Sequence, residues 1–375
     1  MRNGWQIAPM ATLCSIKSGK SNSEDAEQDG EYAFFDRSKK IKKSTRYLYD
    51  CEALIIPGEG AEFLPRHFVG KFDLHQRAYA LFDFSDRIDV RFLYYYLIHF
   101  KDYFVRVAVG ATVKSLRLRH FEQLPVPAPP LPEQQRIVGI LDEAFDGIAT
   151  AKANAEKNLQ NARALFESHL QSVFTQRGEG RVPLSGLTTD ITDGDHMPPP
   201  KSPSGVPFIT ISNIDKNSRR IDFSDTFTVS EDYFDTLKPN RRPRKGDVLY
   251  TVTGSFGIPV RVDHDVDFCF QRHIGLVRPS AETDSTWLYY LLLSPQVFGQ
   301  ASAGATGTAQ KTVSLKVLRN IQVPRVPLVE QREVAAKLDA LATETQRLES
   351  LYQQKLAALD ALKKSLLYQA FSGAL

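Results

Sequence analysis

The chain has 375 residues, of which 42% are hydrophobic and 24% charged, a composition typical of a soluble protein with two or three domains. Lys and Arg number 47 against 44 Asp and Glu, so the net charge of +3 excludes a histone-like polycation, and any surface for nucleic acid has to come from local basic clusters. No apolar run approaches the ~20 residues that cross a bilayer, no secretory signal is visible, and three widely separated cysteines suit a reducing cytoplasm, where we expect the protein to act without membrane attachment.

The first globular part, residues 1–132, predicts a mixed α/β domain. Short β-prone runs such as Ala53–Ile56 alternate with glycine, proline, asparagine and aspartate, and Phe92–Phe100 suits one buried helix. A proline-rich stretch ends this part, and Glu133 then supplies an acidic first turn. No proline follows up to Phe174, so residues 133–176 predict a helix of about 40 residues, about 60 Å long at 1.5 Å per residue.

Residues 177–375 repeat this plan. At a shift of 197 positions, Gly110 aligns with Gly307, Lys114 with Lys311, and the proline-rich helix start with its copy. Further upstream the shift becomes 195, where Gln76-Arg77 aligns with Gln271-Arg272. Because a repeat of this length is as large as a domain, it indicates a duplication and not a solenoid.

The second half therefore predicts its own mixed α/β domain, residues 177–329, and its own long helix, residues 330–375. The β-prone runs here are Phe208–Ile211 and Val248–Val252, and Thr286–Leu293 suits the buried helix. The fold class predicted for the whole chain is α+β, with two similar mixed α/β domains and two long helices as an internal repeat.

The two long helices carry complementary stripes. Large side chains on the second match small ones on the first, as a close-packed helical pair requires. The alternative is that each helix binds a separate partner through an amphipathic face. The stripe positions are Leu141, Ala144, Ile148, Ala151, Ala155, Ala162, Leu165 and His169 on the first helix and Leu338, Leu341, Thr345, Leu348, Tyr352, Leu359, Leu362 and Leu366 on the second.

Catalytic motifs are weak throughout. Gly19-Lys20-Ser21 ends like a phosphate-binding loop, but Cys14 stands where its first glycine belongs. Thr253–Gly257 is one residue short of a nucleophile elbow and favours a flexible loop beside a ligand. Asp193–His196 does not have the spacing of zinc or calcium ligands and favours an ordered turn. We expect no catalytic residue, metal site or cofactor in this chain.

Basic residues cluster in the globular parts, as neutralisation of phosphates requires. For any one cluster the alternative is an ordinary solvated face. Lys114 and Lys311 stand out because each follows a glycine turn, which lets the backbone approach a ligand closely. The candidate DNA-binding residues are Lys39, Lys40, Lys42, Lys43, Arg46 and Lys114 in the first domain, and Lys201, Arg219, Arg220, Arg241, Arg242, Arg244, Lys245 and Lys311 in the second.

In their repeated order these elements resemble the specificity subunit of type I restriction-modification systems. The resemblance rests on Pro125–Gln134, its looser copy Val323–Gln331, and the two domain starts. Those starts run from Trp5-Gln6-Ile7 to Gly19-Lys20 and from Val182-Pro183-Leu184 to Asp193–His196. The first domain has no close match to Asp193–His196, so we expect its reading loop to be built differently.

The resemblance implies that each domain is a target recognition domain for one half of a bipartite sequence in double-stranded DNA. The helices would form an antiparallel coiled-coil spacer that sets the distance between the half-sites and docks two modification (methyltransferase) subunits. Restriction and translocase subunits would complete the complex. S-adenosylmethionine, ATP and Mg²⁺ would belong to these partner subunits.

Two other classes of function stay open at this level. One is a stand-alone DNA-modifying enzyme with an unrecognised site. The other is a coiled-coil adaptor whose basic clusters are incidental.

Overall fold

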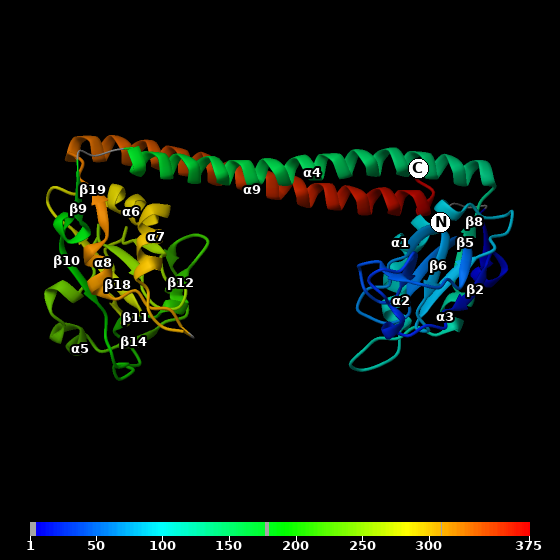
Figure 1. Cartoon of the computed structure of the whole chain (residues 1–375), viewed down its shortest axis with the longest axis horizontal. Helices are drawn as coiled ribbons and strands as arrows, with labels where there is room; N and C mark the ends of the chain where they lie inside the picture. The colour runs from blue at the N-terminus through cyan, green and yellow to red at the C-terminus, as the bar shows by residue number, and fades with distance from the viewer. Residues whose placement is uncertain (1–4, 177–179, 309) are drawn as a thin grey trace. The chain divides into compact units, whose positions relative to one another are not determined.

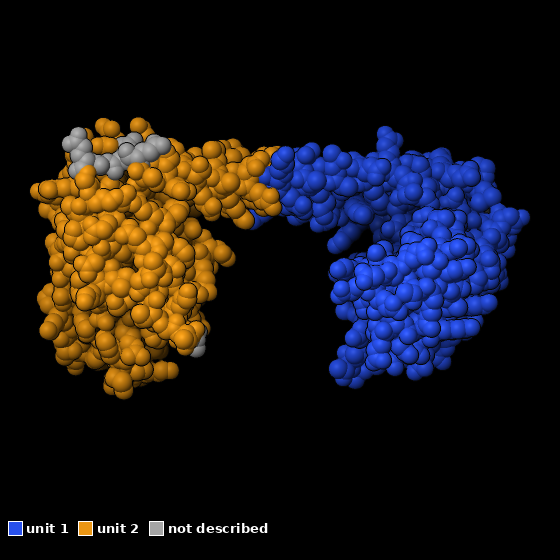
Figure 2. Space-filling model, viewed as in Figure 1, with its two compact units in different colours: residues 1–157, 353–375 blue, residues 158–352 orange. Residues whose placement is uncertain are grey.

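The computed structural model describes residues 5–176, 180–308 and 310–375. The chain divides into two compact units, residues 1–157 with 353–375 and residues 158–352 (Figure 2). Each unit contains one globular part, which we call head one (residues 5–130) and head two (residues 180–327). Two long helices, α4 (Leu131–Gln176) and α9 (Leu328–Ser372), each contribute one segment to each unit (Figure 1).

Head one is built on a six-stranded sheet with the order β2-β7-β5-β6-β3-β4, in which only β3 and β6 are parallel neighbours. A separate ribbon pairs β1 with β8, the strand that leads into α4. The elements are β1 (Gln6–Pro9), η1 (Met10–Thr12), β2 (Ser15–Ser18), η2 (Ser23–Asp25), β3 (Tyr32–Phe35), β4 (Lys42–Ser44), β5 (Tyr49–Pro57), β6 (Arg66–Leu74), β7 (Ala78–Phe82), α1 (Val90–His99), α2 (Lys101–Val107), α3 (Leu118–Glu122) and β8 (Pro125–Ala128).

Head two repeats this order with its sheet in two pieces, β10-β18-β15-β16 and β14-β11-β17. Strands β16 and β17 together take the place of β6, because β16 pairs with β15 and β17 runs parallel to β11. The elements are β9 (Arg181–Pro183), η3 (Leu184–Leu187), β10 (Thr188–Asp193), β11 (Val206–Ile209), η4 (Ile211–Asn213), β12 (Ile214–Asp215), β13 (Arg220–Ile221), β14 (Phe227–Val229), α5 (Glu231–Thr236), η5 (Pro239–Arg241), β15 (Val248–Thr251), β16 (Pro259–Arg261), β17 (Cys269–Phe270), β18 (Ile274–Pro279), α6 (Ser285–Leu293), α7 (Pro295–Gly304), α8 (Leu315–Asn320) and β19 (Gln322–Pro324).

Two connections are longer in head two. Between β11 and β14 it inserts η4 and the β12–β13 hairpin, where head one has only residues 36–41 between β3 and β4. Between β14 and β15 it inserts α5 and η5, where head one has residues 45–48. The two heads therefore share one scaffold and differ in the loops that leave it.

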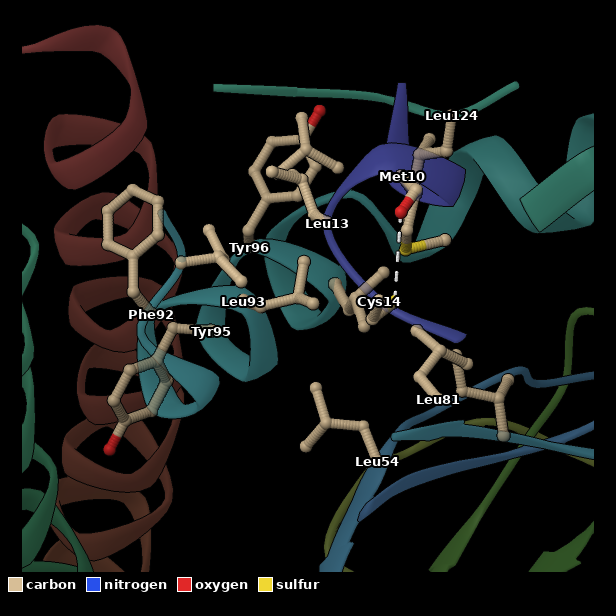
Figure 3. Close-up of a cluster of buried hydrophobic side chains, with 14 of the residues drawn as sticks. Met10, Leu13, Cys14, Leu54, Leu81, Phe92, Leu93, Tyr95, Tyr96 and Leu124 are labelled. Atoms are coloured by element: carbon tan, nitrogen blue, oxygen red, sulfur yellow. Dashed lines mark hydrogen bonds between the residues drawn. The ribbon is translucent and has the colours of Figure 1, made fainter. Parts of the chain in front are cut away.

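The core of head one lies between its sheet and the helices α1 and α4. Figure 3 shows Leu54 and Leu81 on the sheet facing Leu93 on α1, with Met10 and Leu13 beside them. Leu141 of α4 and Leu367 and Phe371 of α9 are buried in the same cluster. Head two has an equivalent core around Trp287 and Leu288 of α6, into which Phe174 of α4 and Leu338 of α9 pack.

A phenylalanine near the end of each long helix closes these cores. The ring of Phe371 lies 5.3 Å from Phe92 and 5.4 Å from Tyr96, measured between centroids. The ring of Phe174 lies 5.8 Å from Trp287 in head two. Each of these edge-on contacts adds about 0.5–1.5 kcal/mol to the stabilisation from burial alone.

A buried glutamine fixes the start of each long helix to its head. Gln134 accepts a hydrogen bond from the Asp89 backbone N–H at 2.8 Å, and its amide N–H groups donate to the carbonyl oxygens of Arg87 and Pro129. Gln331 accepts from the Asp284 N–H, also at 2.8 Å, and likewise donates to two carbonyl oxygens. This is the physical role of the repeated Glu-Gln element: it satisfies backbone groups that burial removes from water.

The helices run antiparallel within each unit. In unit one, Arg136 donates to the carbonyl of Leu375 and Lys152 pairs with Asp360 at 2.8 Å. Residue numbers therefore increase along α4 in the direction in which they decrease along α9. In unit two, Arg163 pairs with Glu349 at 2.7 Å. These contacts confirm the predicted fold class: two similar mixed α/β domains and an antiparallel pair of long helices in an internal repeat.

Part of the predicted stripe is wrong. Leu165 is 64% exposed, His169 is exposed, and Leu362 is 47% exposed. After buried Ala162 the contact face continues through Phe166 and Leu170. The reason is that 3.6 residues per turn displaces a strict heptad by about 20° per repeat, so the buried face moves along the sequence.

At the turn before β7 and β18 the structure also corrects the alignment of the two halves by one residue. The Gly58 N–H donates to the carbonyl of Arg77 at 2.8 Å, and the Val252 N–H donates to the carbonyl of His273 at 2.9 Å. Arg77 is therefore equivalent to His273. The sequence aligns it with Arg272 instead, because Gln76-Arg77 and Gln271-Arg272 are identical pairs.

Candidate nucleic-acid interface

Two short hairpins carry Lys114 and Lys311 at equivalent places in the two heads. The carbonyl of Lys114 accepts a hydrogen bond from the Gly60 N–H at 3.0 Å, and the carbonyl of Lys311 accepts one from the Gly254 N–H, also at 3.0 Å. Both lysines are exposed. The backbone thus holds each lysine in place while its ammonium group stays available to a ligand.

Each hairpin turns at a glycine that no other residue could replace without strain. Gly110 has a φ of +119°, and a Cβ there would lie 2.2 Å from the carbonyl oxygen of Val113. Gly307 has a φ of +102°, and its Cβ would lie 2.4 Å from that of Gln310. The predicted glycine turns are therefore present, and they bring the chain back within hydrogen-bonding reach of itself.

In head one a pocket of about 760 Å³ brings two predicted basic elements together. Lys42 from β4 and Lys114 from the hairpin both line it, together with Arg37. The Asp36 carboxylate contacts the Lys42 ammonium at 2.7 Å and is itself buried. Three cations against one carboxylate leave this pocket with a positive balance, as a phosphate contact requires.

The rest of the first basic run is divided between structure and surface. The Arg46 guanidinium lies 2.8 Å from Asp25 and 3.4 Å from the buried carboxylate of Asp73, so this arginine holds the loop to the sheet. Lys39 pairs with Glu62 at the surface, at 3.2 Å. Lys40 and Lys43 are exposed.

The basic run of head two, Arg241–Lys245, begins at the last residue of η5, in an insertion that head one lacks. Arg242 stacks on Phe234 at 4.7 Å, contacts Asp235 at 3.2 Å and donates to the Leu237 carbonyl, so it stabilises α5. Arg241 contacts Asp193 at 3.2 Å, and Lys245 contacts Asp265 at 3.5 Å. Arg244 is exposed. Arg241 and Arg242 thus have partners in their own head.

Arg219 and Arg220 do not line the pocket at the Lys311 hairpin. They line a pocket of about 670 Å³ between the β12–β13 hairpin and α9, together with Arg261 and Asp339. Arg219 has a φ of +52°, which is strained for a residue with a side chain. Lys201 lies elsewhere, with its ammonium 5.2 Å above the ring of Phe227.

The backbone that carries Asp193 and His196 has a counterpart in head one. Asp193 pairs with Gly275 in the sheet as Ser18 pairs with Tyr79, so Ser18-Gly19 follows the path of Asp193-Gly194. A Cβ at Gly19 or at Gly194 would lie 1.9 Å from a carbonyl oxygen of the adjacent strand. After this glycine head one has one more residue, since Ser21 pairs with His75 as Asp195 pairs with Gln271. The two loops therefore share a backbone path up to the glycine and differ beyond it.

The Asp193–His196 turn is held by contacts within its own head. The His196 imidazole lies 2.9 Å from the Asp193 carboxylate. Burial raises the pKa of the Tyr233 phenol, and a hydrogen bond between its hydroxyl and Asp195 raises it further. Within residues 5–176, 180–308 and 310–375, no three His, Cys, Asp or Glu side chains are grouped as a metal site would require.

The cysteines are free thiols. Burial raises the pKa of Cys14 to about 12, and burial, reinforced by Asp195, raises that of Cys269 to about 12. Thiols with such pKa values stay protonated near neutral pH and make poor nucleophiles.

Comparison with known families decides the identity of this scaffold. A model described as "Type I restriction modification DNA specificity domain" matches residues 2–160 and again residues 188–357. The chain belongs to this family. One match falls on each half of the internal repeat, so the duplicated heads are two copies of the family's DNA specificity domain.

Individual specificity subunits are similar to this chain over most of its length. The EcoDI type I restriction enzyme specificity subunit of Escherichia coli is 21% identical over 399 residues, which cover 99% of this chain and 88% of the relative. The EcoBI specificity subunit of the same organism is 24% identical over 330 residues, covering 80% of this chain and 69% of the relative. The MjaVIII specificity subunit of Methanocaldococcus jannaschii is 21% identical and covers 90% and 86%.

Two solved structures share the fold. One, reported for complex assembly and conformational transition of a type I restriction-modification system, has a TM-score of 0.74 at 19% identity and covers 100% of this chain and 99% of its own. The HsdS subunit of Thermoanaerobacter tengcongensis has a TM-score of 0.61 at 18% identity, with 100% and 98% covered.

Several polar residues beside the specificity-domain hairpins were missed from sequence. Arg77 and Arg117 of head one and His273 of head two line pockets at the hairpin base, and Arg37 joins the Lys42 pocket. In the sequence, Gln76-Arg77 indicates only the repeat. The available signal for a contact is its position in a tight turn between two strands in both halves.

Among the helices that the structure describes, none is long and apolar enough to cross a membrane.

Proposed function

We propose that this chain is the DNA sequence-specificity subunit of a type I restriction-modification complex, without catalytic activity of its own, and that each head recognises one half of a bipartite target in double-stranded DNA. One observation carries the proposal: the same family domain occurs twice with the same backbone anchors, while the loops around them differ. Two copies that recognised the same bases would need no such divergence.

We further propose that the functional division follows residues 1–132 and 177–329 as recognition domains and residues 133–176 and 330–375 as spacers. Lys114 and Lys311 are the contacts to the DNA backbone that we rank first, since both are exposed on equivalent, backbone-anchored hairpins. Exposed Lys40, Lys43 and Arg244 follow. Arg46 and Arg242 rank last, because Arg46 contacts the buried carboxylate of Asp73 and Arg242 stacks on Phe234 with its side chain only 30% exposed.

The helices, in this proposal, set the spacing between half-sites and dock two modification subunits. Support for docking comes from apolar side chains that the helices leave exposed, Leu165, Leu351, Leu362 and Tyr368 among them. Restriction and translocase subunits would join the same complex. S-adenosylmethionine, ATP and Mg²⁺ would act in those partner subunits, in the cytoplasm.

Methylome sequencing of a host that expresses this chain with its modification subunits tests the proposal. We expect one methylated motif made of two unlike half-sites with a fixed, non-specific gap. A continuous motif would contradict the two-head assignment. Methylation or cleavage by the purified chain alone would favour a stand-alone enzyme, and unchanged methylation in a host lacking the chain would favour an adaptor.

A further inference from the structure

The two heads contain small pockets at the same place in the scaffold. The pocket of head one, about 390 Å³, lies where the Lys114 hairpin meets the turn at Gln76-Arg77. The pocket of head two, about 430 Å³, lies where the Lys311 hairpin meets the turn at Arg272-His273. The same hydrogen bond closes both: the Leu116 N–H donates to the carbonyl of Gly58 and the Val313 N–H to that of Val252, each at 2.8 Å.

The polar side chains around these equivalent pockets differ. In head one the Arg77 guanidinium contacts the Glu59 carboxylate at 2.5 Å, and the Ser115 hydroxyl donates to the same carboxylate at 3.3 Å. Glu59 is mostly buried, with its side chain 13% exposed, whereas that of Arg77 is 63% exposed. The carboxylate therefore orients an arginine whose remaining N–H groups face solvent.

Head two differs from head one at three of these matching positions. Thr253 stands where head one has Glu59, so the orienting carboxylate is replaced by a hydroxyl. His273 stands where head one has Arg77, and Arg272 where it has Gln76. The pocket also reaches Asp193 and His196, because Gly275 occupies the position that Tyr79 fills in head one.

We infer that these paired pockets contain the specificity-determining side chains of the two heads, with Arg77 and Gln76 contacting base edges in one half-site and His273 and Arg272 in the other. The inference rests on the function proposed above and names the residues that would carry it. Each turn lies next to a hairpin lysine, so a phosphate contact and a base contact come from adjoining segments. Phosphate contacts fix register, and base contacts specify sequence.

The side chains also assign a chemistry. An exposed arginine held by a carboxylate presents two parallel N–H donors, which suit the O6 and N7 acceptors of guanine in the major groove, and glutamine suits adenine. We therefore assign a guanine contact to Arg77. Glu59 is a positioning residue: it acts on DNA through Arg77.

Exchange of the turn residues tests the assignment in the full complex. One variant carries Gln76→Arg with Arg77→His, and its reciprocal carries Arg272→Gln with His273→Arg, so each head receives residues that the other already accommodates. We expect each exchange to change the methylated motif in one half-site only. The original base at the affected position should lose its advantage by roughly 5- to 150-fold, the discrimination of one good base contact.

Single substitutions keep the assignment testable if an exchange variant fails to fold, as thermal unfolding would show. Arg77→Ala should relax one G·C pair, because alanine has no N–H donor for the O6 and N7 acceptors of guanine. Glu59→Gln should relax the same pair more weakly. Lys101→Ala, on an exposed position of α2 in the same head, is the matched control and should leave the motif unchanged.

The outcomes separate the two levels of the account. If the unaltered complex methylates a bipartite motif and the folded exchange variants methylate the same motif at the same rate, the pockets do not determine specificity. An equal loss of affinity for every sequence would also overturn the inference, since it would make these residues general contacts. Absence of any bipartite methylation by the unaltered complex would instead overturn the proposed function.

Discussion

Head one and head two have the same scaffold of strands and helices but different loops. Both pair a first short strand with the strand before the long helix, both bury an aromatic helix under the sheet, and both close a glycine hairpin with one backbone hydrogen bond. They differ where head two inserts the β12–β13 hairpin and α5. The shared scaffold therefore depends on backbone geometry, which tolerates substitution. We propose that recognition depends instead on side chains at a few fixed positions of that scaffold.

The largest effect should come from the phenylalanines that close the two cores. Phe371→Ala and Phe174→Ala should each cost about 3–5 kcal/mol, the usual cost of emptying a phenylalanine site in a packed core. Because Phe371 touches head one and Phe174 head two, hydrogen exchange should accelerate in α1 for the first variant and in α6 for the second. Equal acceleration in both helices by either variant would contradict the assignment of one phenylalanine to each core.

The buried glutamines should come next. Gln134→Leu and Gln331→Leu should each cost about 2–3 kcal/mol, because buried backbone groups lose their partners. Unfolding in denaturant, monitored by hydrogen exchange in each head, would measure the loss of stability in both variants. Gln135→Leu changes the exposed neighbour and serves as the control. Markedly unequal losses at Gln134 and Gln331 would show that the two anchors are not equivalent.

Removal of one hairpin lysine should have a smaller and purely electrostatic effect. Lys114→Ala or Lys311→Ala should reduce the slope of log affinity against log salt concentration by about 0.9 for DNA binding by the complex, the value for one phosphate contact. Arg242→Ala should instead lower the stability of head two without changing that slope, since Arg242 stacks on Phe234. A changed slope with Arg242→Ala and an unchanged one with Lys114→Ala would reverse our ranking.

The smallest effect concerns pH and is confined to head one. Burial lowers the pKa of His99, which stacks on Phe371, and nearby Asp102 offsets only part of this. The folded state then binds fewer protons than the unfolded state, so stability is lost as pH falls through the ordinary value of about 6.5 toward the folded value. The free energy of unfolding of head one should decrease from pH 7 to pH 5, and His99→Gln should show a smaller decrease.

Much of the fold could be predicted because the chain contains it twice. The helix starts, the buried helices and the glycine turns appeared as matching residues, and the structure contains all of them. Details that depend on a single residue of register could not be predicted. The identical residue type at Arg77 and Arg272 led to their alignment, although the backbone makes Arg77 equivalent to His273. A heptad spacing predicted that Leu165 is buried, whereas the buried face of α4 passes through Phe166.

The residues of the candidate site were harder to predict from the sequence than the fold, for a physical reason. A run of basic residues does not reveal which members have a carboxylate nearby, and Arg46, Arg241 and Arg242 each have one through folding. Nor does sequence show that residues 36–42 and the Lys114 hairpin line one pocket. Only Lys114 and Lys311 could be singled out, because the repeat placed both after a glycine turn.

Replacement of one head by the other tests the central claim most directly. In this variant, residues 6–130 are replaced by a second copy of residues 181–327, so that one copy of head two precedes each long helix. Methylome sequencing of a host that expresses the variant complex would identify its target. We expect the half-site of head one to disappear and that of head two to occur twice. Methylation that keeps both original half-sites would contradict the claim that each head determines its own half of the target.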